Sequence, residues 1–324
     1  MHTNQFFSNQ GFREERQKIT PPFHILKSKL ITIGQGFPYV PYIYNQKIIA
    51  FNAKTIISLS INDFEEEWRV TLSNDLFNDS FWIPMLYENK VLVHNGGKRT
   101  FDIYDLKNGT IIEQIKNYEI QTYLIERHLF GFDFYSDDDQ YFIVKYNLEE
   151  NFKIMWREPT QADWSSRVLM NKNKLVFNTE NGFNCHDWET GKFLWECEVV
   201  DYANPYQHLL WEEQVIIPKG GSVISLDIHT GKTQWQQPIS FAQGTIYGNK
   251  IHLIKSTQYA VLDAKTGKAE VSIDLTPHYQ GFEDRMENAL TYGLAVTEDY
   301  AIYGSSSGYL FIIDKWTGKL IWHY

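Results

Sequence analysis

The sequence predicts an all-β protein, a seven-bladed β-propeller of four-stranded antiparallel blades. Three observations support this fold class. A short string of the type Asp-x-x-Thr-Gly-Lys-x-x-Trp returns several times along the chain. Its copies and their weaker relatives follow one another at intervals near 40 residues, and each interval has room for four short strands. Radial closure of such units explains how so many strands leave no long open edge.

The repeated string is clearest at Asp187–Trp195, and later copies begin at Asp227, Asp263 and Asp314. An Asp at the end of a strand accepts hydrogen bonds from turn amides, and a Gly supplies the positive φ at which the chain reverses. The string therefore predicts a strand, a tight turn and a second strand. Its Asp, Thr and Lys are structural residues in this interpretation, not a catalytic or phosphate-binding cluster.

Seven units follow from the position equivalent to the turn Asp, which recurs every 36 to 51 residues. These positions are Ser60, Asp105, Asn147, Asp187, Asp227, Asp263 and Asp314. The units are expected at about Tyr39–Val70, Trp82–Ile115, Tyr118–Glu158, Ser165–Val199, Tyr206–Ile239, Phe241–Leu275 and Asn288–Tyr324. The first turn is degenerate, and the third, around residues 149–151, is longer than the others.

The chain is expected to divide into a polar N-terminal arm, residues 1–34, and the propeller, residues 35–324. Within the arm, Phe23–Ile33 alternates apolar and polar residues well enough to be a strand. This candidate closing strand either pairs with the last blade or packs against it.

Charge and hydropathy restrict the partners and the compartment. The formal net charge is −10, so the field of the whole molecule repels nucleic-acid backbones and anionic lipid. The N-terminus lacks the apolar segment of a signal peptide, and no stretch approaches the roughly 18 apolar residues that span a bilayer. We therefore expect a soluble, cytoplasmic monomer that binds neither nucleic acid nor membrane.

The two cysteines, Cys185 and Cys197, lie on either side of the turn of the fourth unit. A disulfide between them would close a small loop. Free thiols are the favoured alternative, because structural disulfides are rare in a reducing cytosol.

From Tyr39 to Tyr324 the units resemble the tryptophan-docking repeat of the pyrroloquinoline-quinone-type (PQQ-like) β-propellers. The resemblance implies that a Trp near the start of each outer strand packs across onto the neighbouring blade. Blades two and six have Glu113 and Val271 instead and are expected to form looser seams. The tryptophans given this structural role are Trp68, Trp156, Trp195, Trp235 and Trp322.

Enzymes of the quinoprotein family hold their quinone with a vicinal disulfide and a calcium ion. This sequence has no adjacent Cys pair, so no cofactor and no catalysis are expected. Gly304–Gly308 matches the G-x-S-x-G string of serine hydrolases, but it lies between two predicted strands and not at a strand-to-helix elbow. The histidines are scattered singly, and the acidic run at residues 137–139 lacks the pattern of a calcium loop, so no metal site is predicted.

Acidic and aromatic residues gather in the blade-to-blade connections and in the turns between second and third strands. These segments share one face of a propeller, and aromatic anchors surrounded by charge are typical of protein-binding surfaces. The alternative is that the aromatics cap the blade ends and the acids keep the loops soluble. The candidate partner-binding residues are Asp75, Phe77, Asp79, Phe81, Asp137, Asp138, Asp139, Asp163, Trp164, Asp201, Tyr202, Tyr279, Phe282, Glu283 and Asp284.

The function predicted from these features is that of a non-catalytic protein-binding propeller with a basic protein partner. By analogy, a bacterial immunity protein that caps and neutralises a toxin domain has these properties. Two alternatives stay open. One is a ligand-binding, sugar-binding or enzymatic propeller that uses its central channel, and the other is a scaffold in a larger assembly.

Overall fold

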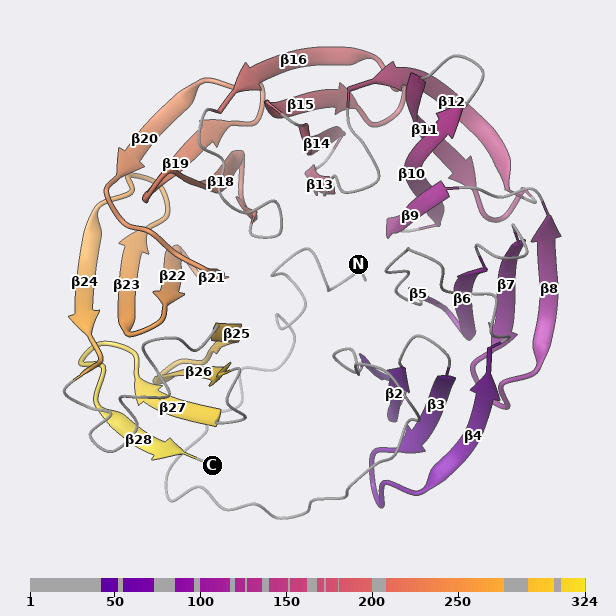
Figure 1. Cartoon of the computed structure of the whole chain (residues 1–324), viewed down its shortest axis with the longest axis horizontal. Helices are drawn as coiled ribbons and strands as arrows, with labels where there is room; N and C mark the ends of the chain where they lie inside the picture. The colour runs from indigo at the N-terminus through magenta and orange to yellow at the C-terminus, as the bar shows by residue number, and fades with distance from the viewer. Residues whose placement is uncertain are drawn as a thin grey trace. The chain divides into compact units, whose positions relative to one another are not determined.

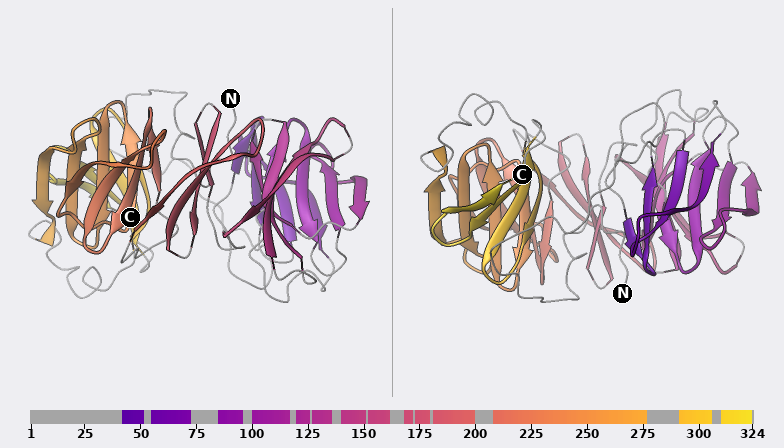
Figure 2. Two further views of the ribbon diagram at one scale, coloured as in Figure 1. Left: turned by 90° about the horizontal axis from the view of Figure 1, so that it is seen from above. Right: turned by 90° about the horizontal axis from the view of Figure 1, so that it is seen from below.

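The computed structural model describes residues 42–51, 55–72, 85–95, 100–116, 120–125, 127–135, 140–150, 152–161, 168–171, 173–179, 181–199, 208–276, 291–305 and 310–323. Within these ranges the strands form seven four-stranded antiparallel sheets, and no α-helix occurs (Figure 1). The fold class is therefore all-β, a seven-bladed β-propeller of four-stranded blades, as predicted. The sheets are twisted in the usual way (Figure 2).

The chain divides into two compact units. Of the described residues, those from 42 to 140 and Val144–Met155 form the N-terminal unit, and Tyr141–Ile143 and those from 156 to 323 form the C-terminal unit. The boundary between the units falls within the sheet of the third blade. The expected arm and closing strand, residues 1–34, lie outside the described residues.

The first three blades begin near the predicted positions. Blade 1 consists of β1 (Tyr42–Tyr44), β2 (Lys47–Phe51), β3 (Thr55–Ser60) and β4 (Glu66–Thr71). Blade 2 consists of β5 (Met85–Tyr87), β6 (Lys90–Asn95), β7 (Thr100–Asp105) and β8 (Ile111–Lys116). Blade 3 consists of β9 (Ile120–Ile125), β10 (His128–Tyr135), β11 (Gln140–Asn147) and β12 (Lys153–Thr160).

The last four blades follow the same plan. Blade 4 consists of β13 (Val168–Asn171), β14 (Lys174–Thr179), β15 (Gly182–Asp187) and β16 (Phe193–Glu198). Blade 5 consists of β17 (Leu209–Trp211), β18 (Gln214–Lys219), β19 (Ser222–Asp227) and β20 (Thr233–Gln237). Blade 6 consists of β21 (Gln243–Tyr247), β22 (Lys250–Lys255), β23 (Gln258–Asp263) and β24 (Ala269–Asp274). Blade 7 consists of β25 (Thr291–Val296), β26 (Tyr300–Ser305), β27 (Leu310–Asp314) and β28 (Leu320–His323).

Each repeated turn is closed by its Asp and its Gly, as the sequence predicts. In blade 4, Asp187 Oδ1 accepts hydrogen bonds from the Thr190 amide and hydroxyl, at 2.9 and 2.7 Å. The amide of Gly191, which has a φ of 76°, donates to the Asp187 carbonyl at 2.8 Å. The same bonds recur at Asp227, Asp263 and Asp314. The turn is thus determined by side chains within five residues of one another.

Two blades make this turn without the consensus residues. In blade 1 the Phe64 amide donates to the Ser60 carbonyl at 2.9 Å, and Phe64 takes the positive φ, 60°, that a glycine has elsewhere. In blade 3 the residue with positive φ is Phe152, which lies one position later relative to Asn147. The turn of blade 1 therefore keeps the hydrogen bond and the positive φ without the preferred residues, whereas the turn of blade 3 is one residue longer.

The turn glycines also contact tryptophans of the preceding blade. A Cβ added at Gly231 would lie 2.6 Å from the Trp195 ring, and one at Gly191 would lie 2.6 Å from Trp156. The same relation joins Gly109 to Trp68 and Gly267 to Trp235. Only a residue without a side chain leaves room for the indole at these positions, which adds a packing reason to the conformational one.

Three of these tryptophans are also hydrogen-bonded to the next blade. The indole N–H groups of Trp68, Trp156 and Trp195 donate to the carbonyls of Leu106, Trp188 and Ile228, at 2.9, 3.0 and 2.9 Å. Their side chains are buried. Each contact joins two adjacent blades within one unit, and burying an aromatic ring of this size stabilises that packing by several kcal/mol, about 3 to 5 when judged by truncation.

The other two tryptophans lie in different surroundings. Trp235 donates to Gln214 Oε1 of its own blade at 3.2 Å while its ring contacts Gly267 of the next. Trp322 lies on β28 opposite Ile312 and is half-buried. Between blades 6 and 7, where no Trp is available, Ile273 and Leu275 take the place of the indole against Gly318. This seam is thus filled by aliphatic side chains from other positions of the strand.

The strand order places each connection at a definite end of its blade. Every sheet is an up-and-down meander, and consecutive strands are antiparallel neighbours. The turn between the second and third strands therefore lies at the same end as the segments that enter and leave the blade, which we call the connector end. The turns between first and second strands and the Asp-x-x-Thr-Gly-Lys turns lie at the opposite end, the turn end.

Candidate functional site

The predicted partner-binding residues all lie outside the described residues, in segments between strands. Their places in the chain can be given only relative to the described strands. Asp75–Phe81 separates β4 from β5, Asp163–Trp164 separates β12 from β13, and Asp201–Tyr202 separates β16 from β17. Tyr279–Asp284 separates β24 from β25, and Asp137–Asp139 joins β10 to β11. Their role in binding stays a prediction.

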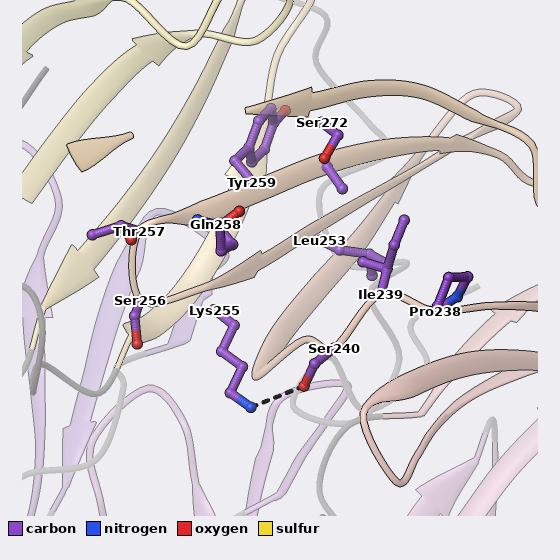
Figure 3. A pocket seen from close by; sticks show the side chains of 11 residues that line it. Pro238, Ile239, Ser240, Leu253, Lys255, Ser256, Thr257, Gln258, Tyr259 and Ser272 are labelled. Atoms are coloured by element: carbon purple, nitrogen blue, oxygen red, sulfur yellow. Dashed lines mark hydrogen bonds between the residues drawn. The ribbon is translucent and has the colours of Figure 1, made fainter. Parts of the chain in front are cut away.

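A pocket of about 440 Å³ opens at the connector end of blade 6, within the C-terminal unit. One wall is the hairpin between β22 and β23, and the other is the connection from β20 to β21 (Figure 3). Apolar side chains of Ile239 and Leu253 lie next to each other on one side. The other lining residues are Pro238, Ser240, Lys255, Ser256, Thr257, Gln258, Tyr259, Ala260 and Ser272.

Backbone hydrogen bonds fix both walls of this pocket. The Ile239 amide donates to the Gln237 carbonyl at 2.8 Å, and the Ala242 amide donates to Ile254 at 2.9 Å, which ties the connection to β22. On the hairpin side, the Leu275 amide donates to the Thr257 carbonyl at 2.7 Å. The pocket is thus part of the folded blade and does not depend on a ligand for its shape.

Lys255 is the charged residue of the pocket. Its ammonium group donates to Ser240 Oγ at 2.9 Å, so the side chain extends from β22 to the opposite wall (Figure 3). The lining residues include neither Asp nor Glu. The nearest acid along the outer strand, Asp274, is bonded to the amide and hydroxyl of Thr276 and to the Thr257 hydroxyl, and these bonds lower its pKa.

A second, shallower pocket of about 710 Å³ lies at the turn ends of blades 4 to 6. Its acidic residues are Glu212, Glu213, Asp227 and Asp263, and Lys265 is its cation. The carboxylate of Asp227 holds its own turn and accepts from Gln234 at 3.0 Å. Asp263 Oδ1 accepts from Thr266 and holds the turn of blade 6, and Asp263 Oδ2 pairs with the Lys250 ammonium group at 3.4 Å. The two aspartates are therefore engaged in maintaining the turns, and Glu213 pairs with His229 at 3.3 Å.

A buried polar cluster joins blades 6 and 7. His252, fully buried, accepts or donates a hydrogen bond at 2.7 Å between Nδ1 and the Tyr259 hydroxyl. Burial, together with repulsion from Lys315 and Lys250, lowers the pKa of His252 to about 3. Burial also raises the pKa of Tyr259. Both groups are neutral at ordinary pH, as expected for a hydrogen-bonded pair in an apolar seam.

Lys315 of this cluster occupies a position that is apolar in the other consensus turns, where Leu106, Trp188, Ile228 and Ala264 stand. The Lys315 side chain is buried, donates to the Thr297 carbonyl at 2.9 Å, and lies 4.6 Å from the centre of the Tyr247 ring. Burial lowers its pKa, although nearby Asp299 and Glu298 oppose that effect. The Thr297 carbonyl and the Tyr247 ring thus stabilise the buried charge of Lys315.

The described chain also settles the surroundings of the other residues considered for catalysis, disulfide formation or metal binding. Cys185 and Cys197 are free thiols, which agrees with the favoured alternative, and burial raises the pKa of Cys185 to about 12. Gly304 lies on β26 and pairs with Leu310 of the antiparallel strand β27. This arrangement is that of a β-hairpin and not that of a nucleophile elbow. No three or more described His, Cys, Asp or Glu residues approach closely enough to hold a metal ion. The described chain also contains no helix with the length and hydrophobicity required to cross a membrane.

Sequence reasoning missed the pocket of blade 6. The available signal was that lysines end the second strands of blades 5 and 6, at Lys219 and Lys255. In blade 5 two glycines, Gly220 and Gly221, follow the lysine, whereas Ser256 and Thr257 follow it in blade 6. This difference could have been noticed, but the contact with Ser240 depends on how the connection folds back over the hairpin.

Seven four-stranded sheets, with turn glycines that contact the tryptophan of the preceding blade, define a PQQ-like β-propeller. The family model described as outer membrane protein assembly factor BamB matches residues 143–324, more than half of the chain. The chain belongs to this family, and the predicted family resemblance is confirmed. No curated protein matches the sequence.

Solved structures of the same fold differ widely in function. The computationally designed protein Ika8 has a TM-score of 0.64 at 13% identity, over 88% of this chain and 85% of that one. BamB from Moraxella catarrhalis has a TM-score of 0.58 at 12% identity, over 82% and 79%. A europium-containing methanol dehydrogenase has a TM-score of 0.62 at 10% identity, over 88% and 77%. At these identities the likeness shows the fold alone.

Proposed function

We propose that this chain is a non-catalytic, protein-binding β-propeller whose partner docks at the connector ends of the blades. The observation that supports this most directly is the distribution of residue types along the topology. Acidic and aromatic residues gather in the segments that separate one blade from the next and between second and third strands, whereas the Asp-x-x-Thr-Gly-Lys string recurs between third and fourth strands. Aromatic side chains provide contact area and the acids steer an oppositely charged partner.

The family supports a role in binding other proteins. The matching model takes its description from an outer membrane protein assembly factor, and assembly requires recognition of other proteins. The fold is also shared with dehydrogenases, so the proposal depends on the loops and not on the fold. The formal net charge of −10 favours a basic partner, and a toxin domain neutralised by an immunity protein is the specific case that we propose.

The test compares two triple variants that change the net charge equally. The first carries Asp163→Lys, Asp201→Lys and Asp284→Lys at connector ends. The control carries Glu88→Lys, Glu189→Lys and Glu212→Lys, which replace exposed residues of turn-end turns. A partner captured stoichiometrically from the native host, then purified, is titrated against each variant.

The connector-end variant is expected to raise the Kd at least about tenfold, which corresponds to about 1.4 kcal/mol, while the control changes it much less. Equal effects of the two variants would mean that only the total charge matters and would overturn the proposed surface. Failure of the native chain to capture any stoichiometric partner would overturn the proposed function itself.

A further inference from the structure

We propose that the pocket at the connector end of blade 6 binds a carboxylate borne on a short aliphatic stem, as in an acidic peptide segment. The inference goes beyond the proposed function, because it concerns a cationic pocket and not the acidic loops. It rests on the composition of the lining, on the position of the Lys255 ammonium group and on the apolar side of the pocket.

The charge of the pocket contrasts with that of the whole chain. Acidic residues outnumber basic ones in the sequence, 40 to 30, yet the residues that line the pocket in the described part of the chain include one lysine and no acid. Among the described residues Lys255 forms no ion pair, and its hydrogen bond goes to a neutral hydroxyl, Ser240 Oγ. An ammonium group has three N–H donors, so two are available to a ligand. An anion is the ligand that this arrangement favours.

The Lys255 side chain is exposed, and one hydrogen bond positions its ammonium group. Its hydrogen bond to Ser240 holds the long side chain across the pocket, so less rotamer freedom is lost when a ligand binds. Hydrogen bonds from charged donors to carboxylates are stronger than those between neutral groups. The hydroxyls of Ser240, Ser256 and Ser272 and the Gln258 amide are neutral donors that can complete the contact with the anion.

The hairpin between β22 and β23 of blade 6 has hydroxyl-bearing residues where the corresponding hairpin of blade 5 has glycines. In blade 5 the two-residue turn is Gly220–Gly221, and both residues have positive φ. Blade 6 has Ser256 with a φ of 50° and then Thr257. A non-glycine residue at positive φ carries a cost in backbone strain. That cost brings hydroxyl groups to the rim of the pocket.

The apolar side of the pocket determines what carries the carboxylate. Leu253 and Ala260 are buried, and Ile239 packs against the same core cluster between blades 5 and 6. A volume of about 440 Å³ is at the small end of ligand pockets and suits one or two residues. A glutamate side chain, or the terminal carboxylate after an aliphatic residue, combines the apolar stem with the charge.

Methyl NMR of the full-length protein tests this with defined probes. The probes are acetyl-Leu-Glu-N-methylamide and acetyl-Gly-Leu with a free carboxylate, and each has a neutral control, the Gln analogue or the amide. The carboxylate probes are expected to shift the methyl signals of Ile239, Leu253 and Ala260 in a saturable way, with the neutral controls binding at least about tenfold more weakly. Whichever carboxylate probe binds more tightly identifies the side chain or the chain terminus as the source.

Two variants distinguish the site from general attraction to lysine. Lys255→Met is expected to abolish saturable binding, and Lys255→Arg to retain it. Lys219→Met removes the lysine at the corresponding position of blade 5 and is expected to leave binding unchanged. Equal shifts with neutral probes, equal loss from both methionine variants, or absence of binding by either carboxylate would overturn the inference. Each of these outcomes leaves the capture experiment on the acidic loops unaffected.

Discussion

The turn glycines satisfy two requirements at a single residue. Gly191, Gly231 and Gly267 have φ angles of 76°, 68° and 70°, and a Cβ at any of them would lie within 2.6 Å of an indole ring. The first requirement, a positive φ, is local and belongs to the turn. The second requirement, space for an indole ring, comes from the neighbouring blade, because the ring belongs to the outer strand of the preceding sheet.

Replacement of Gly231 by alanine separates these two requirements when it is compared with Gly248→Ala. Both glycines have positive φ, but a Cβ at Gly248 would have no atom within 4 Å. Gly248→Ala is expected to cost roughly 1 kcal/mol of unfolding free energy from backbone strain. Gly231→Ala is expected to cost clearly more, because the Trp195 ring must shift. Urea denaturation measures both, and equal losses would mean that the ring contact contributes nothing.

The thiol of Cys185 should be unreactive in the folded protein. Cys185 is fully buried, and burial raises its pKa to about 12, so almost no thiolate exists near neutral pH. A Cys197→Ser variant, which leaves only this thiol, is expected to react with a thiol reagent such as DTNB only after unfolding. Rapid stoichiometric reaction under native conditions would show that the blade opens far more often than its packing implies.

At the scale of the element, the repeated hairpin depends on its Asp. Asp227 Oδ1 accepts three hydrogen bonds, from the His229 amide and from the Thr230 amide and hydroxyl. Burial alone would raise the pKa of Asp227, but these hydrogen bonds outweigh burial and lower it. The turn therefore stabilises the ionised carboxylate of Asp227, and its Asp, Thr and Gly lie within five residues of one another.

Asp227→Ala is expected to lower the unfolding free energy by about 1 to 3 kcal/mol, because it removes hydrogen bonds to a charged acceptor. Asp227→Ser is the matched comparison, since blade 1 has Ser60 at this position and still forms the turn. The serine variant should lose less stability than the alanine variant. Thermal and urea unfolding measure the difference, and identical losses would contradict the role given to the side-chain oxygen.

For the whole molecule, buried histidines connect stability to pH. His252 has a pKa lowered to about 3, mainly by burial, and the pKa of His186 is also lowered by burial although its bond to the Gly191 carbonyl opposes this. In the unfolded chain both would take up a proton near their ordinary value of 6.5. The unfolded state therefore binds more protons than the folded state as the pH falls from 6.5 towards the folded pKa, and stability is lost over that range.

A His252→Asn variant should show a weaker dependence of unfolding free energy on pH below 6.5. The histidine contributes a slope of up to about 1.4 kcal/mol per pH unit between pH 6.5 and about 3. The slope is compared, and not the absolute stability, so a destabilised variant remains informative. An unchanged slope in His252→Asn would show that this histidine is not neutral in the folded state.

The sequence by itself determined the number of blades and the place of each turn. Turn chemistry is local: the Asp, Thr and Gly of Asp227–Gly231 act within five residues, so their order in the chain is enough to recognise them. Even the degenerate turn at Ser60 could be placed by its interval from Asp105. The resemblance to a known repeat supplied the tryptophans, because no local rule links Trp195 to a residue of the next blade.

Only the tertiary structure decided which distant residues meet. Trp195 reaches the Ile228 carbonyl and Gly231, Lys255 reaches Ser240, and His252 is buried beside Lys315. Each of these contacts depends on how one sheet packs against the next or on how a connection folds back over a hairpin. Sequence periodicity specifies the strands that form a sheet, whereas the match of side-chain shapes and charges between sheets is fixed only when they pack.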